Sequence, residues 1–142
     1  MILFDTTVLC YAVGEPHPLR EPCRSLLDWH GEGSLHAATT IEVVQEFAHV
    51  RARRRSRADA VQVARHYAAA LTLLTAAPDD LDLGLSLYQR HEDLGAFDAV
   101  LAAVTINQGL DALVSADNAF ARVPSLRWID PRRPNLRRLV AS

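Results

Sequence analysis

Four acidic residues stand at positions from which they could act together on a substrate. Asp5 directly follows the short apolar run 2–4, and Asp117 comes two positions after a second apolar run. Asp98 opens an apolar helical segment, and Glu46 lies on the polar stripe of another predicted helix. If the two apolar runs are parallel strands, their carboxyl ends meet at the sheet edge where such folds bind ligands. The sequence therefore predicts that the four carboxylates converge at this edge.

Asp98 is the acid whose surroundings most need an explanation. The run 99–103 that follows it is entirely apolar, so its helix should be buried on most of its surface. All 15 basic residues of the chain are arginines, and the nearest one before Asp98, Arg90, lies beyond Gly95. Carboxylates gathered in a partly buried pocket repel one another unless a cation joins them. Oxygen ligands without Cys or His at metal spacing indicate Mg²⁺ or Mn²⁺, and with it the hydrolysis of a phosphate ester.

Each acid also has a purely structural interpretation. Asp5, Asp98 and Asp117 could each cap the N-terminus of a helix. Glu46 could lie on a solvated helix face beside Arg53. Taken one at a time these interpretations are favoured, but they do not explain the apolar surroundings of Asp98.

Short apolar strands alternate with helical segments along the chain. This alternation requires crossover connections, and it predicts an α/β fold with a mainly parallel central sheet of four or five short strands and helices on both faces. We expect one domain over residues 1–130 and a C-terminal tail over 131–142. Strands are expected at 2–4, 34–38, 71–75, 112–115 and 126–129, helices at 8–13, 19–29, from Thr39 or Thr40 onward, 58–70, 81–91 and 96–108, and one helical turn at 117–121.

The composition restricts the possible partners. The chain has 142 residues and a net charge of -2, so no global positive field attracts nucleic acid, and any such contact needs a local patch. No segment approaches the ~20 apolar residues of a membrane span, and residues 1–4 are too short for a signal-peptide core. We therefore expect a cytoplasmic protein that does not bind membranes. Cys10 and Cys23 are the only cysteines, which argues against a disulfide scaffold or a structural zinc site.

The residues around the four acids resemble the PIN-domain nucleases, most closely the VapC toxins of bacterial type II toxin-antitoxin pairs. The similarity rests on four segments in the family's order, Ile2–Leu9, Val43–Phe47, Phe97–Ala103 and Leu113–Phe120. It implies a PIN-like α/β/α sandwich and a metal-dependent endoribonuclease that uses Mg²⁺ or Mn²⁺. It assigns catalysis to Asp5, Glu46, Asp98 and Asp117, metal binding to Asp5, Asp98 and Asp117, and supporting roles near the metal to Thr6 and Ser115.

Two features of this resemblance stay open. Thr7 stands where the family usually has Asn or Ser, although a hydroxyl can still donate and accept a hydrogen bond. Glu42 lies one turn before Glu46 on the same helix face and is a second candidate for the helix acid. The sequence Gln45-Glu46-Phe47 matches the family pattern better, so we prefer Glu46.

The resemblance also implies partners. It implies RNA as the substrate, a homodimer, and a small VapB-like antitoxin. The C-terminal segment of that antitoxin would lie in a groove between helices such as 9–13 and 19–29 and direct a basic side chain toward the acids.

The basic run at the end of the helix that carries Glu46 is the local patch that RNA would need. We expect Arg51, Arg53, Arg54 and Arg55 to contact the phosphate backbone of the substrate. The alternative is a solvated helix end, with arginines near the last carbonyls. A second group of arginines, in the tail, is expected to be solvated or flexible.

Other functional classes fit less well. Receiver domains and haloacid-dehalogenase-like phosphatases also place an Asp after a parallel strand, but they rely on a lysine, and the phosphatases have a second Asp where this chain has Thr7. A non-catalytic PIN-like binding module would be expected to have lost one of the acids. That module and a stand-alone nuclease without an antitoxin remain the alternatives.

Overall fold

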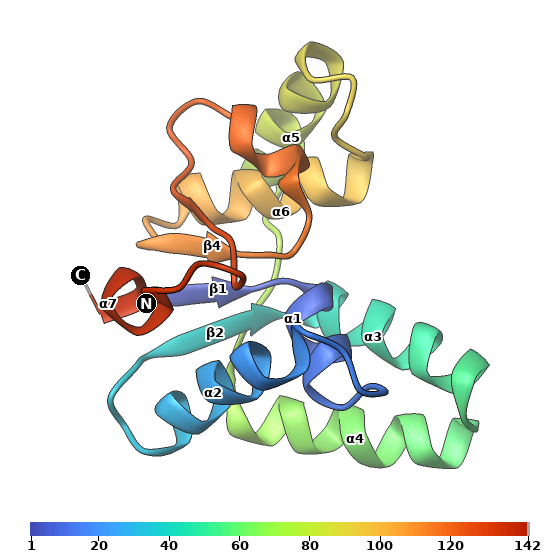
Figure 1. Cartoon of the computed structure of the whole chain (residues 1–142). Coiled ribbons are helices and arrows are strands. Elements are labelled where there is room, and N and C mark those ends of the chain that lie inside the picture. Colours follow the sequence, from blue (N-terminus) through green and yellow to red (C-terminus); the bar gives the residue numbers. More distant parts are fainter. Residues whose placement is uncertain (142) are drawn as a thin grey trace.

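Five parallel strands form one sheet in the computed structural model of the chain, which describes residues 1–141 (Figure 1). The order across the sheet is β3-β2-β1-β4-β5, and each neighbouring pair is parallel. The predicted fold class is therefore confirmed, and the ends of β1 and β4 lie side by side. The strands are β1 (Ile2–Phe4), β2 (Ala37–Thr40), β3 (Thr72–Leu74), β4 (Ala112–Val114) and β5 (Trp128–Ile129).

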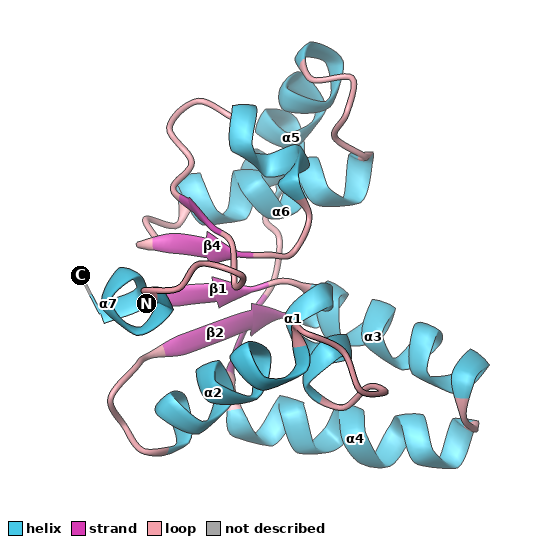
Figure 2. Cartoon of the chain, viewed as in Figure 1, coloured by secondary structure: helices cyan, strands magenta, loops and turns pink. Residues whose placement is uncertain are grey.

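Helices provide the crossovers that parallel strands require. Figure 2 shows α5 and α6 together above the strands and α1 to α4 below them. The helices are α1 (Thr6–Ala12), α2 (Arg20–Gly31), α3 (Ile41–Arg54), α4 (Arg57–Ala70), α5 (Pro78–Arg90), α6 (Ala96–Asn107) and α7 (Leu136–Ala141), with a 3₁₀ helix η1 (Asn118–Arg122).

The second strand begins later than the sequence predicts. It occupies 37–40 and not 34–38, because the backbone N–H groups of Ser34 and Leu35 both donate to the carbonyl of Trp29. These two residues therefore belong to the turn that follows α2. The later register places Thr40 directly before α3, where its hydroxyl caps the helix by accepting from the N–H of Val43.

Two helices extend beyond the predicted elements. α5 begins at Pro78, a residue suited to the first turn of a helix, whereas the sequence predicts a start at Leu81. The expected tail contains α7, whose Leu136 and Val140 are buried. Arg137 of α7 lies over the ring of Trp29, 5.1 Å from its centre. The described part of the tail is thus packed on the rest of the protein.

The core explains why the helix of Asp98 is so apolar. The strands β1, β2 and β4 are buried along their whole length. Helix α6 contacts both β4 and α5, and it buries Ala99 and the run 101–105. Gly84 lets α5 approach α6, since a Cβ at this position would lie 2.7 Å from the Val100 side chain. Within residues 1–141, no helix is long and apolar enough to cross a membrane.

Candidate active site

Asp5 is fixed at the end of the central strand. It follows β1, caps α1 and is 3% exposed. Its Oδ1 accepts from the backbone N–H of Thr7 at 2.8 Å and from the Thr7 hydroxyl, and its Oδ2 accepts from the Ser115 hydroxyl. Burial raises the pKa of Asp5 above its ordinary value, although these hydrogen bonds favour the charged form. The carboxylate is thus desolvated and held in one orientation.

Two hydroxyl groups connect Asp5 to the segment that follows β4. The Ser115 Oγ donates to Asp5 and accepts from the backbone N–H of Asp117 at 3.0 Å. The Thr7 Oγ1 also donates to Asp5 and accepts from the backbone N–H of Ala116 at 2.9 Å. Asp117 itself accepts from the N–H of Ala119 at 2.9 Å and so caps η1. The first and fourth acids are therefore positioned by one hydrogen-bonded network.

Asp98 and Glu46 face this network from two helices. Asp98 lies in the first turn of α6, and burial together with the negative charges of Asp5, Asp117 and Glu46 raises the pKa of its carboxyl to about 7. The negative charges of Asp5, Asp117 and Glu46 all act on Asp98, so each of them lies close enough to repel its carboxylate. The capping interpretation holds for Asp5 and Asp117 but not for Asp98, because Gly95 is the N-cap of α6.

A cleft between α1 and α3 opens beside these acids. Its volume is about 460 Å³, and Thr6, Thr7 and Glu46 belong to its lining. The Thr6 hydroxyl is buried and, within residues 1–141, has no hydrogen-bond partner. A buried hydroxyl without a partner costs free energy, so a ligand that pairs with it is favoured.

The residues present fit a hard divalent cation. The donor set consists of carboxylate and hydroxyl oxygens, and the unpaired Thr6 Oγ1 lies beside it. Burial and the neighbouring negative charges both raise the pKa of Asp98, and a bound cation would oppose both effects. Among the described residues, no three Asp, Glu, His or Cys side chains are placed closely enough to hold an ion between them. An ion at this site would therefore keep several waters, as Mg²⁺ usually does.

Glu42 is placed apart from the acid cluster. Its carboxylate accepts from the Thr75 hydroxyl at 3.1 Å and from the backbone N–H of Ala76 at 2.8 Å. These bonds join the start of α3 to the segment between β3 and α5. Of the two candidates on α3, only Glu46 acts on the pKa of Asp98.

The four arginines at the end of α3 differ in what they contact. Arg51 pairs with Asp59 at 2.5 Å and donates to the carbonyl of Val13 at 2.9 Å, and the partly buried ion pair lowers the pKa of Asp59. Arg55 pairs with Glu15 at 2.9 Å.

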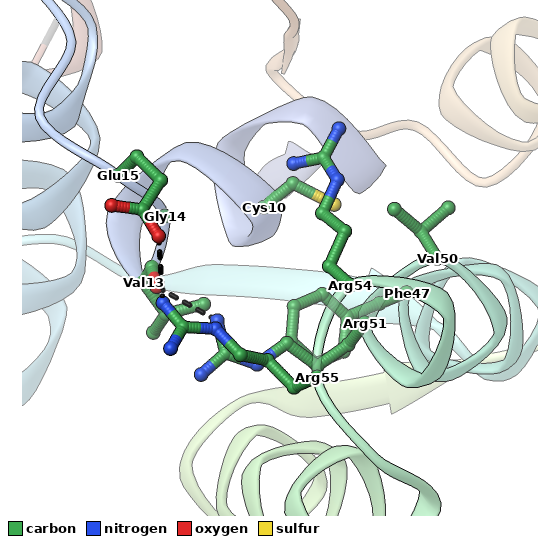
Figure 3. A pocket seen from close by; sticks show the side chains of 9 residues that line it. All are labelled: Cys10, Val13, Gly14, Glu15, Phe47, Val50, Arg51, Arg54 and Arg55. Carbon is green, nitrogen blue, oxygen red and sulfur yellow. Dashed lines mark hydrogen bonds and ion pairs between the residues drawn. The ribbon is translucent and has the colours of Figure 1, made fainter.

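Arg53 and Arg54 are exposed, and no ion pair or hydrogen bond joins either guanidinium to another group among residues 1–141. Figure 3 shows that the Arg54 side chain passes Cys10 toward α1, on the opposite side from the guanidinium groups of Arg51 and Arg55. Two of the four arginines predicted to bind substrate are therefore engaged within the protein, and Arg54 alone also lines the cleft.

Sequence reasoning missed several residues of this cleft. Thr7 was noted only as a departure from the family, yet its hydroxyl bridges Asp5 and the segment after β4. Cys10, Tyr11 and Gly14 line the cleft with Thr7. Their spacing of three, four and seven residues from Thr7 is typical of one helix face, and this periodicity is the signal that could have found them.

Comparisons with known proteins agree with this geometry. The PIN domain family model matches residues 2–126. Ribonuclease VapC7 of Mycobacterium tuberculosis is 44% identical over an alignment of 139 residues, and the alignment covers 92% of this chain and 92% of that protein. Ribonuclease VapC23 of the same species is 33% identical over 85% of this chain and 96% of its own. A toxin-antitoxin complex from Klebsiella pneumoniae contains a chain of similar fold, with a TM-score of 0.68 and 20% identity over 92% of this chain and 98% of that one.

Proposed function

This chain belongs to the PIN domain family and, within it, to the VapC ribonucleases, and from this premise we propose that it hydrolyses RNA phosphodiesters with the help of a divalent metal ion. The observation that carries the proposal is that Asp5 and Asp117 follow two neighbouring parallel strands and are joined through Ser115, with Asp98 of α6 and Glu46 of α3 near enough for their charges to interact. Such a cluster is costly without a cation, and a divalent ion bound there could activate a water beside the scissile phosphodiester.

Asp5, Asp98 and Asp117 would hold the ion, in part through its bound waters, with Thr6 beside them. A bound Mg²⁺ or Mn²⁺ would supply an activated water and would offset the negative charge of the phosphodiester in the transition state. The chain's own residues do the positioning. Ser115 and Thr7 hold both oxygens of Asp5, so this carboxylate needs no rearrangement to bind.

Glu46 is assigned to the substrate side of the same site. It belongs to both the acid cluster and the cleft lining, and it comes from a helix that carries none of the other acids. Its negative charge opposes phosphate binding in the absence of a cation. We therefore expect metal and RNA to bind cooperatively.

The biological role we propose is that of a toxin controlled by a small VapB-like antitoxin. The relatives are named VapC ribonucleases, and the structurally similar Klebsiella protein is part of a toxin-antitoxin complex. A basic antitoxin side chain placed among the acids would relieve the same repulsion that a metal ion relieves, so antitoxin and metal should compete. We further propose that the protein acts in the cytoplasm as a homodimer.

Expression in a bacterial host tests this proposal. The wild-type chain should arrest growth, the Asp5→Asn variant should not, and a map of RNA 5′ ends after brief induction should show new cleavage sites only with the wild type. Co-expression of the small neighbouring open reading frame should restore growth and give a complex that co-purifies. Growth arrest by Asp5→Asn at equal expression would contradict the nuclease role and favour a binding module. Arrest that persists beside a stably expressed neighbour would contradict the toxin-antitoxin role.

A further inference from the structure

Arg54 is the cation of the cleft between α1 and α3. It lines this cleft together with Glu46, which lies about two turns earlier on the same helix, and Figure 3 shows its side chain passing Cys10 toward α1. No carboxylate among the described residues neutralises it, whereas its neighbours Arg51 and Arg55 are both paired. A positive group at this end and a cation site at the other would place two points of attraction for phosphate along one cleft.

An aromatic pair forms part of the same lining. The rings of Tyr11 and His17 lie 4.6 Å apart and are tilted by 32°. The Nδ1 of His17 accepts from the backbone N–H of Leu19 at 3.0 Å, which fixes the ring and leaves the proton of the neutral imidazole on Nε2. Rings held in this way offer a flat surface and a hydrogen-bond donor. Bases of single-stranded RNA stack on such surfaces and form hydrogen bonds through their edges.

From these contacts we propose that the cleft between α1 and α3 is a subsite for one nucleotide of the RNA strand next to the scissile phosphodiester. The phosphate of this nucleotide binds Arg54, and its base packs against Tyr11 and His17. The inference rests on the proposed ribonuclease function and adds to it a site of strand recognition. It also explains how a protein with a net charge of -2 attracts RNA, since the positive charge is placed locally.

Binding measured without catalysis tests the subsite. The probe is a short fluorescein-labelled single-stranded oligoribonucleotide of mixed sequence, in EDTA, with fluorescence anisotropy as the readout. Arg54→Gln should weaken binding on the order of tenfold and should lower the slope of log K against log salt by about 0.7, the value for one phosphate contact on a single strand. Arg65→Gln is the matched control, because it removes an exposed charge of α4 that does not line the cleft, and it should change affinity less than twofold.

Inorganic polyphosphate separates the base contact from the phosphate contact, because it carries phosphates without bases. Tyr11→Leu should weaken RNA binding on the order of tenfold and leave polyphosphate binding unchanged, whereas Tyr11→Phe should keep both affinities. Arg54→Gln should weaken both ligands.

The subsite is overturned if Arg54→Gln binds RNA as Arg65→Gln does, or if Tyr11→Leu weakens polyphosphate binding as much as RNA binding. It is also overturned if the wild type binds the oligonucleotide neither in EDTA nor with Ca²⁺ added in place of EDTA. A wild type that shows the expected binding pattern but does not cleave RNA when Mn²⁺ is added would support the subsite and contradict the proposed catalysis. If the wild type cleaves RNA but the two arginine variants bind it equally, the proposed catalysis is supported and the subsite is contradicted.

Discussion

At the scale of single residues, Asp98 connects the geometry of the site to the stability of the protein. Its pKa is about 7 in the folded chain, whereas the ordinary value is 3.8. Between these two values the folded state retains a proton that the unfolded state has released. The contribution of Asp98 to the free energy of unfolding therefore falls as the pH rises from about 4 to about 7.

We predict that Asp98→Asn stabilises the metal-free protein above pH 7 and has little effect below pH 4. The amide has the size of the carboxylate but carries no charge at high pH, so it removes the cost of burying that charge among three other acids. In EDTA at pH 8, the melting temperature should rise by on the order of a few degrees. Asp82→Asn, at an exposed position of α5, is the control and should show no such pH dependence. A melting temperature that falls equally at both pH values would mean that the acids do not repel.

At the scale of elements, α3 carries two glutamates that perform different tasks one turn apart. Glu42 joins the helix to Thr75 and Ala76, whereas Glu46 faces the acid cluster and the cleft. Periodicity places both residues on one helix face, and the sequence alone therefore leaves two candidates. The segment after β3 distinguishes the two glutamates, because it binds Glu42 and not Glu46. Its position depends on long-range packing.

We expect the alanine variants of these two residues to affect different properties. Glu42→Ala should lower the free energy of unfolding by about 1–3 kcal/mol, because it leaves the N–H of Ala76 without its acceptor, and it should keep RNA cleavage. Glu46→Ala should keep or raise stability and reduce cleavage by on the order of 10². Urea denaturation and a cleavage assay on the same preparations measure both. The assignment is wrong if Glu42→Ala is the variant that loses activity in the folded state.

The contact between α5 and α6 supports the helix that presents Asp98. Gly84→Ala should destabilise the protein by about 1–3 kcal/mol, because the new Cβ would lie 2.8 Å from the backbone of Val100. Gly31→Ala is the control, since a Cβ there meets nothing within 4 Å. Thermal unfolding of the two variants compares them directly. Equal melting temperatures for the two variants would show that α5 can move away from α6 without loss of stability.

At the scale of the whole molecule, the parallel sheet and the places of Asp5 and Asp117 after its strands could be predicted because they depend on local patterns. Asp5 and Asp117 follow apolar runs, and the ends of parallel strands meet whatever the details of packing. The hydrogen bonds of Thr7 and Ser115, the pairing of Arg51 with Asp59 and the packing of α7 join residues far apart in the chain. No local pattern indicates such contacts. The sequence therefore predicted four arginines that bind substrate and could not show that Arg51 and Arg55 pair within the protein.

The central claim is that the acid cluster around Asp98 cleaves RNA with a divalent ion, and single-turnover cleavage of RNA by the purified chain measures it most directly. With Mg²⁺ or Mn²⁺ we predict cleavage by the wild type, loss of cleavage in EDTA, and a rate lower by on the order of 10² to 10³ for Asp98→Asn in the folded state. Cleavage by Asp98→Asn at the wild-type rate, or wild-type cleavage that continues in EDTA, would contradict the account.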